Sequence, residues 1–439
     1  MFLNQSGKGK KELWLSARKI NLRKILFFLI LLFLPTQLGR HFWPRFSYLF
    51  GIRVDYLSPT LYLTDVFILC LFCISVFCFF KKRNFGNFLR KNRNKILHIC
   101  LIFVFLALTS VFSENVLAGF YGEIKFFEFV FLGFYSVNIL KKISFEKILS
   151  AFSVGIIFES SLSIFQYLNQ KSLGGFFYLF GERSFTGQTP GIANASLGGD
   201  LILRPYGTFP HPNVLAGYLL LFMTLILFNM EGRNKLIKNI YLISLILGSL
   251  GILLSLGRFP FILWLLTIAI FAFKKNKEKF KKIIISSLLA LSIVVSFIFY
   301  TPFYLRFFET SFFDESFVLR SELLVSAFQK ILESPIIGHG LNNYFTDSKV
   351  LGNIFYLQPV HNIFVLVFLK VGLIGFLYSL WFIIKTIQNF NKKTPLFIKL
   401  TFFYIIIIGF FDHYFLTLQQ GQLMLTFFLS LYFAKIKYD

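Results

Sequence analysis

Charged residues are scarce in this chain of 439 residues, and acidic ones are the scarcest. Asp and Glu number 20 against 45 Lys and Arg, and the four types together make up 15% of the chain. Apolar residues make up 56%, above the roughly 45–50% of a soluble domain, which excludes an ordinary water-soluble enzyme. There are only four cysteines, and the single C-x-x-C (Cys70 and Cys73) has no second pair or nearby His with which to build a zinc site.

Long apolar runs are what the sequence has in abundance. Twelve of them are long enough to cross about 30 Å of hydrocarbon as helices. Because lipid cannot satisfy exposed backbone groups, and because the alternating pattern of a membrane barrel is absent, the runs predict an all-α polytopic membrane protein. The predicted spans are 24–38, 60–80, 96–113, 118–139, 148–167, 213–229, 239–256, 259–273, 283–300, 359–382, 397–412 and 417–434.

The distribution of basic residues predicts the orientation. With the N-terminus inside, the inner segments hold 32 of the 45 Lys and Arg and the outer segments hold 11. Cytoplasmic loops are enriched in these residues, so we expect the basic N-terminus (1–24) and the C-terminus (435–439) to be cytoplasmic, with residues 24–434 forming one transmembrane domain. The basic runs are short caps on helices, which argues against nucleic acid as a partner. The first run lacks a small-residue cleavage signature and is interpreted as an uncleaved anchor.

The unusual residues gather at the predicted outer face. Two long stretches, 168–212 and 301–358, are expected there as non-helical loops, and the second lies between the ninth and tenth predicted helices. Long loops in a compact domain are usually functional or disordered. Five of the six histidines also fall at this face, namely His41, His211, His339, His361 and His413. These positions favour a site on the outer side.

The first candidate motif is R-P-Y-G-T-F-P-H-P-N at residues 204–213, just before the sixth predicted helix. Proline is tolerated in a first helical turn, so Pro212 is expected to open this helix. Arg204, His211 and Asn213 would then lie near the lipid headgroups, where they can meet a phosphate or a hydroxyl. A plain Pro/Gly-rich turn with an interfacial arginine explains the same spacing.

A second motif is the tight turn S-L-G-R-F-P at residues 255–260. The planar guanidinium of Arg258 suits phosphate oxygens. An arginine at this place can equally be an anchor that extends its charged end to the interface.

The third motif occupies the large outer loop and the helix after it. Arg320 is followed by G-H-G-L-N at residues 338–342, then by His361-Asn362 and an apolar helix containing Gly372 and Gly375. A histidine at the mouth of a helix can act as a general base, because its ordinary pKa lies near the working pH. Glycines beside His339 allow close approach of backbone to a ligand. Alternatively, His361 caps the helix and the glycines shape a turn.

Taken in order, these motifs resemble the O-antigen ligase-like membrane glycosyltransferases, a group that includes O-antigen ligases and polymerases of O-antigen and exopolysaccharide. The resemblance rests on R-P-x-G-T-x-x-H-P-N, a turn arginine after a Ser, G-x-G-x-N, an H-N pair and G-x-x-G, over roughly residues 200–380. The family usually has S-x-S-R-G at the turn, whereas Gly257 and Phe259 replace its second Ser and its last Gly here.

The resemblance implies a donor glycan linked to polyprenyl diphosphate, a glycan or lipid acceptor, and transfer with inversion at the outer face of the cytoplasmic (inner) membrane. It assigns catalysis to His361 as base and to Arg258 and Arg320. The residues expected to bind substrate are Arg204, His211, Asn213, His339 and Asn362. The outer loops contain no D-x-D or His cluster with metal-ligand spacing, so no metal or other cofactor is expected, and guanidinium groups would take the electrostatic role of a metal.

Charged residues inside the predicted spans leave other functions open, because such residues are costly in a membrane. They are Asp65, Glu123, Lys125, Glu128 and Glu159. Lys125 and Glu128 can pair on one helix face, which is a structural explanation. The same charges fit a transporter or flippase of lipid-linked sugars. A third alternative, a peptidoglycan polymerase of the shape, elongation and division type, requires a catalytic acid in the large outer loop.

Overall fold

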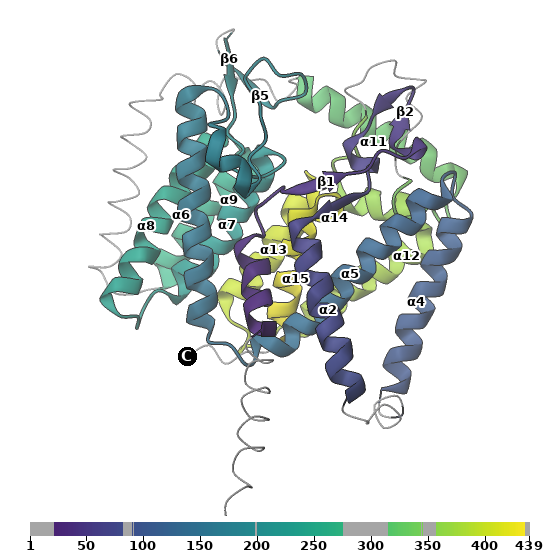
Figure 1. Cartoon of the computed structure of the whole chain (residues 1–439), viewed down its shortest axis with the longest axis horizontal. Coiled ribbons are helices and arrows are strands. Elements are labelled where there is room, and N and C mark those ends of the chain that lie inside the picture. Colours follow the sequence, from purple (N-terminus) through teal and green to yellow (C-terminus); the bar gives the residue numbers. More distant parts are fainter. Residues whose placement is uncertain are drawn as a thin grey trace, which may run out of the picture.

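The structure, a computed structural model, describes residues 22–81, 90, 92–197, 200–274, 315–343, 345 and 357–434 (Figure 1). Most of the terminal segment 1–24, the ninth predicted span (283–300), the first part of the large outer loop and residues 435–439 lie outside the described residues. The described part is predominantly helical, as the apolar runs predict.

Six described helices are long and apolar enough to cross a membrane. They are α2 (Leu63–Lys81), α4 (Arg93–Val111), α6 (Phe145–Asn169), α7 (Pro212–Asn229), α8 (Lys235–Leu254) and α12 (Ile363–Gln388). The total of twelve spans and the cytoplasmic position of the termini stay predictions.

Further helices complete the bundle. The 25-residue helix α5 (Val116–Leu140) has the length of a span but carries Glu123, Lys125 and Glu128. Shorter helices are α9 (Arg258–Lys274), α13 (Leu396–Gly409), α15 (Gln419–Ala434) and the single turn α14 (Tyr414–Thr417), and residues 22–32 are also helical. In Figure 1, α6, α7, α8 and α9 form the left side, α2, α4, α5 and α12 the right side, and α13 and α15 stand between them.

The predicted outer loops contain more regular structure than expected. Three antiparallel pairs, at the upper end in Figure 1, join β1 (Gly39–His41) to β4 (Thr60–Tyr62), β2 (Tyr48–Leu49) to β3 (Ile52–Arg53) and β5 (Asn194–Leu197) to β6 (Asp200–Leu203). Short 3-10 turns are η1 (Arg45–Ser47), η2 (Asp55–Leu57) and η3 (Gly175–Phe180).

The stretch 301–358 was predicted to be non-helical, and that prediction is wrong for α11 (Glu315–Glu333). Its residues Leu323, Ala327 and Ile331 recur every four positions and are buried, which is the pattern of an amphipathic helix. Polar residues interrupt the apolar ones throughout this segment, so the length of apolar runs does not predict the helix. α11 packs on α12.

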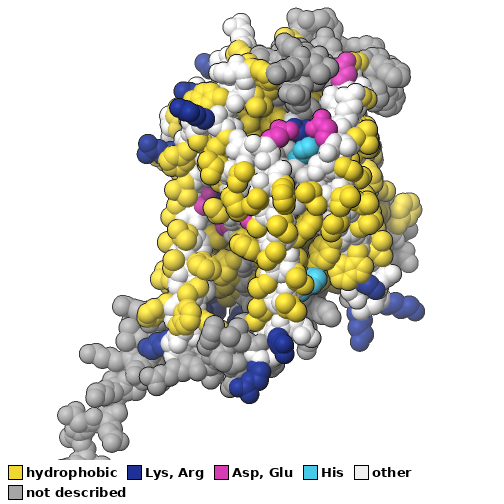
Figure 2. Space-filling view, turned by 90° about the vertical axis from the view of Figure 1, so that its right-hand side faces the viewer, with side chains coloured by type: hydrophobic (Ala, Val, Ile, Leu, Met, Phe, Trp, Pro, Cys, Tyr) yellow, Lys and Arg dark blue, Asp and Glu magenta, His cyan; other side chains and the backbone are white. Residues whose placement is uncertain are grey.

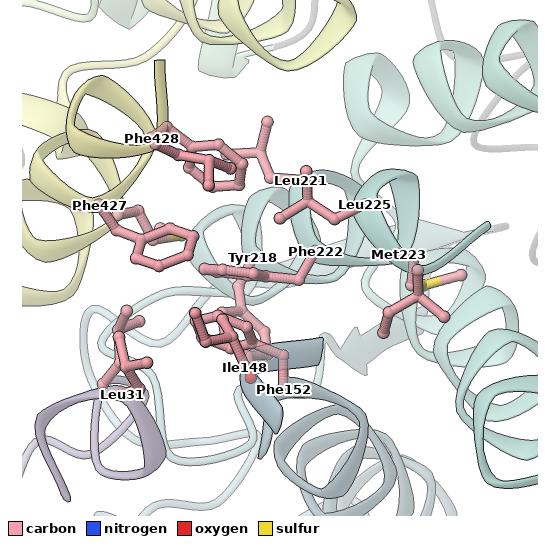
Figure 3. Close-up of a cluster of buried hydrophobic side chains, with 14 of the residues drawn as sticks. Leu31, Ile148, Phe152, Tyr218, Leu221, Phe222, Met223, Leu225, Phe427 and Phe428 are labelled. Atoms are coloured by element: carbon pink, nitrogen blue, oxygen red, sulfur yellow. The ribbon is translucent and has the colours of Figure 1, made fainter. Parts of the chain in front are cut away.

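The main core lies on the left side of the molecule and is centred on α7. This helix contacts α6, α8, α9, α13 and α15. Phe222 of α7 stacks on Phe152 of α6 with ring centroids 3.8 Å apart, and Phe427 and Phe428 of α15 close the cluster (Figure 3). Burial of aromatic rings in such contact fixes the position of α7, and therefore of the loop that leads into it.

Helix α12 is broken at Gly372, whose φ of 61° and ψ of −169° are not helical. The loop after α11 fills the break: the N–H groups of His339 and Gly340 donate to the carbonyls of Leu369 and Lys370, at 3.0 and 2.9 Å. In return, the N–H of Leu373 donates to the carbonyl of Pro335 at 2.8 Å. These bonds satisfy backbone groups that a broken helix would otherwise leave unpaired.

Candidate functional site

Three chain connections meet at one place, and each brings polar side chains. His211 is the N-cap of α7, and Pro212 occupies its first turn as predicted. Asn362 is the N-cap of α12, where its side-chain oxygen accepts hydrogen bonds from the N–H groups of Phe364 and Val365. Asp412 and His413 form the corner between α13 and α14.

We call His211, Arg320, His361, Asp412 and His413 the junction cluster. The rings of His361 and His413 lie 4.8 Å apart in an edge-to-face arrangement. The ligating atoms of His361, Asp412 and His413 all lie within 4.8 Å of one another. The charge of Arg320, on α11, acts on all four other members. The structure thus brings together His211, Arg320 and His361, which the sequence singled out at widely separated positions.

Asp412 is held by the first motif. Its Oδ2 accepts a hydrogen bond from Asn213 Nδ2 at 2.8 Å, and its Oδ1 accepts one from the N–H of His413 at 2.8 Å. Asn213 in turn accepts from Arg204 at 2.6 Å, and Arg204 Nε donates to the carbonyl of Ser255 at 2.8 Å. Arg204 is only 7% exposed. In this arrangement Arg204 connects the turn before α9 to Asp412 instead of pointing to open solvent.

A hydrogen bond fixes the neutral form of one imidazole. Nδ1 of His211 accepts from the N–H of Asn213 at 3.1 Å, so the proton of the neutral ring is on Nε2. Nδ1 of His413 shares a hydrogen bond with Thr417 Oγ1 at 2.6 Å. Nδ1 of His361 is buried and has no hydrogen-bond partner.

Burial and mutual repulsion keep the imidazoles neutral at pH 7. Burial lowers the pKa of His361 well below 6.5, and the charges of His413 and Arg320 lower it further, against the opposing effect of Asp412. Burial likewise lowers the pKa of His211 to about 3 and that of His413 to about 4. Burial raises the pKa of Asp412, but the positive charges that the three histidines carry in acid, and that of Arg320, outweigh it and lower this pKa overall. At pH 7 an ionised carboxylate thus stands beside unprotonated rings, as a general base requires.

Two predicted residues lie in other surroundings. Arg258 begins α9, and its neighbour Phe259 stacks on Phe411, next to Asp412, with centroids 3.7 Å apart. His339 is buried at the break in α12, where its Nε2 donates to the carbonyl of Lys330 at 2.7 Å. Gly338 and Gly372, both with positive φ, approach each other there. The glycines of the third motif therefore bring two stretches of backbone together.

A large cavity begins beside the junction cluster. Its volume is about 1710 Å³, and the end nearest the cluster is lined by His41, Tyr56, Arg183 and His211. The ring of Tyr56 packs against that of His413 at 5.5 Å. From there the cavity continues between α4, α5, α12 and α15 as far as Ile398, near the start of α13. Figure 2 shows the face formed by this side of the molecule: hydrophobic side chains cover its middle band, and acidic side chains are visible in a hollow between them.

Within the part of the chain that the structure describes, two groups of side chains have the spacing of metal ligands. In the first (His361, Asp412 and His413), both Asp412 oxygens already accept hydrogen bonds from the protein. In the second (Glu114, Glu333 and His339), Nε2 of His339 bonds to the backbone and Glu114 pairs with Lys330 at 3.0 Å. Protein partners therefore occupy much of the ligand capacity of each group.

Sequence reasoning missed Asp412 and Tyr56 and gave His413 no role. Asp412 is a lone acid between two apolar runs, and the Asp-His pair at that point was the only available signal. The sequence did predict the pairing of Lys125 with Glu128, and the structure confirms this pair at 2.8 Å. It did not predict the second partner of Lys125, which is Asp65 of α2, also at 2.8 Å.

Comparison with protein families gives a match over part of the chain. Residues 243–380 match the family model described as O-antigen ligase. The segment contains Arg258, Arg320, His339 and the His361-Asn362 pair, whereas Arg204 and Asp412 lie outside it. A search of curated proteins finds no match. Together with its apolar helices, this match shows a multi-pass membrane protein whose residues 243–380 are similar to the O-antigen ligases, membrane enzymes of polysaccharide biosynthesis.

Proposed function

We propose that the chain is a glycosyltransferase that moves a glycan from polyprenyl diphosphate to an acceptor hydroxyl at the outer face of the cytoplasmic membrane. The observation that carries this proposal is the junction cluster: a neutral imidazole, an ionised carboxylate and an arginine meet within the chain that carries the ligase match. Nucleotide sugars are not available outside the cytoplasm, so an outer site needs a donor that arrives through the lipid.

In the proposed reaction, His361 removes the proton from the acceptor hydroxyl. The acceptor oxygen forms a bond to the anomeric carbon of the donor sugar, and the bond from this carbon to the diphosphate oxygen breaks. The electron pair of the broken bond leaves with the diphosphate, and attack from the opposite side inverts the anomeric centre. Asp412 stabilises the imidazolium that forms on His361, as a carboxylate beside a general base does.

The arginines have different parts in this scheme. Arg320 is half-buried on α11 and acts electrostatically on the cluster. We therefore assign it the role of stabilising the negative charge that develops on the leaving diphosphate. We assign the second contact with the diphosphate to Arg258, which lies at the start of α9. Arg204, whose contacts run to Ser255 and Asn213, positions Asp412 through Asn213. Guanidinium groups in these places make a metal unnecessary, and transfer is expected to continue in EDTA.

The test is transfer by purified protein in nanodiscs, with a polyprenyl-diphosphate glycan and candidate acceptors. His361→Ala is expected to lower the transfer rate about 10²–10⁴-fold, the usual contribution of a general base. Glu146→Gln is the control, because Glu146, near the start of α6, pairs with Arg233 and neither residue lines the cavity, and it should leave transfer unchanged. If the His361 variant transfers as fast as the wild type, the proposed base is wrong.

A lipid-linked-sugar flippase is the second candidate, and one observation favours it: Lys125 and Lys370 line the cavity. A flippase moves intact lipid-linked glycan between leaflets of a proteoliposome and makes no new glycosidic bond. We expect the opposite result, namely new bonds without movement of the donor between leaflets. The peptidoglycan-polymerase alternative has less support, because the acid of the junction cluster, Asp412, lies outside the large outer loop.

A further inference from the structure

The proposed reaction gives no part to the middle of the first motif, Gly207 and Thr208, which form a buried turn. Glu159 of α6 meets this turn with both oxygens of its carboxylate. Its Oε2 accepts a hydrogen bond from the N–H of Thr208 at 2.8 Å, and its Oε1 accepts one from the Thr208 hydroxyl at 2.7 Å. Glu159 is only 2% exposed and Thr208 only 1%. A carboxylate inside a membrane helix therefore holds the middle of the motif.

A second side chain of α6 holds the same turn. Gln166 lies seven residues after Glu159, on the same face and about 10 Å farther along the helix. Its oxygen accepts from the N–H groups of Tyr206 and Gly207 at 3.0 and 2.8 Å, and its nitrogen donates to the carbonyl of Gly207 at 3.0 Å. Three successive N–H groups, from residue 206 to residue 208, thus point at α6. Successive N–H groups in a turn form a concavity that favours an anion, and Glu159 supplies that anion.

Gly207 provides the room for this contact. Its φ is 58°, in the left-handed region, and a β-carbon added there would collide with Oε2 of Glu159. A side chain at this position would therefore push the carboxylate away from Thr208. The Gly-Thr pair of the motif thus has a physical explanation: the glycine lets Glu159 approach, and the threonine gives it a second donor.

A carboxylate is a costly anchor at this place, because burial away from water penalises its charge. Within the described part of the chain, no Lys or Arg forms an ion pair with Glu159. Its advantage is geometric. Two acceptor oxygens on one planar group take the N–H and the hydroxyl of the same residue, Thr208, and so fix both the place and the orientation of the turn.

The turn lies between two residues that lead to the junction cluster. Thr208 comes four residues after Arg204 and five before Asn213. Arg204 donates to Asn213, and Asn213 donates to Asp412. A shift of the turn would move Asn213 and lengthen its bond to Asp412. Catalytic rates are sensitive to such shifts, since a displacement of about 1 Å can lower a rate about 10²-fold.

We propose that Glu159 is a positioning residue of the transferase: by holding Gly207 and Thr208, it sets the place of Asn213 and thereby of Asp412 in the junction cluster. Glu159 does not line the cavity, so its effect passes through the motif. The inference rests on the proposed function for the reaction, and the experiment is designed so that the two can fail separately.

The experiment measures single-turnover glycan transfer by the full chain in nanodiscs, per amount of folded protein. Glu159→Leu removes both acceptors at similar side-chain size and should lower the rate about tenfold to hundredfold. Glu159→Gln keeps one oxygen for the Thr208 N–H and can donate to the Thr208 hydroxyl, so it should retain most of the rate. Ser163→Ala is the matched control: Ser163 is buried on α6 between Glu159 and Gln166, but its hydroxyl bonds within the helix, and the rate should not change.

A second pair of variants reaches the same contact from the other side, with less disturbance of the fold. Thr208→Val removes the hydroxyl at nearly constant shape and should lower the rate about threefold to tenfold, the effect of one hydrogen bond. Thr208→Ser keeps the hydroxyl and should transfer as the wild type does. This pair decides the matter if Glu159→Leu does not fold.

A double-mutant cycle with Asp412→Asn separates positioning from a general structural role. If Glu159 acts through Asp412, then Glu159→Leu and Thr208→Val should have little further effect, less than about threefold, once Asp412 has been replaced. A general loss of structure would instead lower the rate by the same factor in both backgrounds, and that result would overturn the inference.

Transfer that is unchanged in both Glu159→Leu and Thr208→Val would also overturn it, and would leave the proposed function intact. A Ser163→Ala variant as slow as Glu159→Leu would have the same consequence, because any disturbance of α6 would then suffice. Absence of transfer in the wild type would remove the proposed function, and this inference with it.

Discussion

The two sides of the molecule are built differently. On the left side of Figure 1, 83% of the apolar stretch of α7 is buried, whereas on the right only 17% of that of α4 and 28% of that of α12 is buried inside the protein. The dense side holds the motif 204–213, and the open side surrounds the cavity. The comparison shows that one helical membrane protein combines a densely packed frame around this motif with an open region beside it. The junction cluster lies where the two sides meet.

The largest effect is expected at that meeting point. Asp412→Ala removes the acceptor of Asn213 and the only carboxylate of the junction cluster, so we expect transfer to fall at least about 10²-fold. Asp412→Asn keeps an acceptor oxygen without the charge, so its transfer rate should lie between that of Asp412→Ala and that of the wild type. The measurement is the single-turnover rate in nanodiscs. Glu146→Gln, which removes a partner of Arg233 at a distant site, is the control. Equal transfer rates for all variants would mean that Asp412, at the meeting point of the two sides, has no part in the reaction.

On the dense side, Phe222→Ala should destabilise the fold. The ring is fully buried against Phe152 and Phe427, and removal of such a side chain costs about 3–5 kcal/mol of unfolding free energy. On the open side, Ile374→Ala should cost much less, because half of this side chain is exposed. Thermal unfolding in one detergent compares the two. Similar losses would contradict the distinction between a packed and an open side.

The break in α12 is expected to have a smaller effect on stability. Gly372→Ala introduces a methyl group against the carbonyl of Ile336 at a positive φ, and such strain costs about 1–3 kcal/mol. Gly187→Ala, where a methyl group meets nothing within 4 Å, should have no effect. The melting temperature and the transfer rate of each variant give the comparison. A Gly372 variant as stable as the Gly187 variant would show that the loop after α11 does not need this close approach.

The smallest effect is a shift of the pH dependence. The pKa of His361 is lowered below 6.5, so its unprotonated form persists in mild acid and the transfer rate should fall only below pH 6.5. Arg320 lowers this pKa, and the residual activity of Arg320→Gln should therefore be lost at a higher pH than that of the wild type. The pH profile of transfer, with an acceptor that does not titrate, checks both. A profile unchanged by Arg320→Gln would place Arg320 outside the electrostatic reach of the base.

Local patterns predicted the helices and the residues that lie near each other along the chain. Run length located most apolar helices, and proline chemistry placed the start of α7 at Pro212. Asp412 could not be predicted, because its partner Asn213 is 199 residues away and a lone acid has no periodicity. The close approach of Gly338 to Gly372 could not be predicted either, because the sequence around each glycine is equally consistent with an ordinary turn or helix.

The central claim is that His361 and Asp412 act as one unit in glycan transfer, and a double-mutant cycle measures it most directly. The transfer rates of the wild type, His361→Ala, Asp412→Ala and the double variant would be determined under single-turnover conditions. If the carboxylate acts through the imidazole, the double variant is no slower than His361→Ala, because removal of one member already disables the unit. Losses that multiply in the double variant would show that the two residues act independently, and would contradict the account.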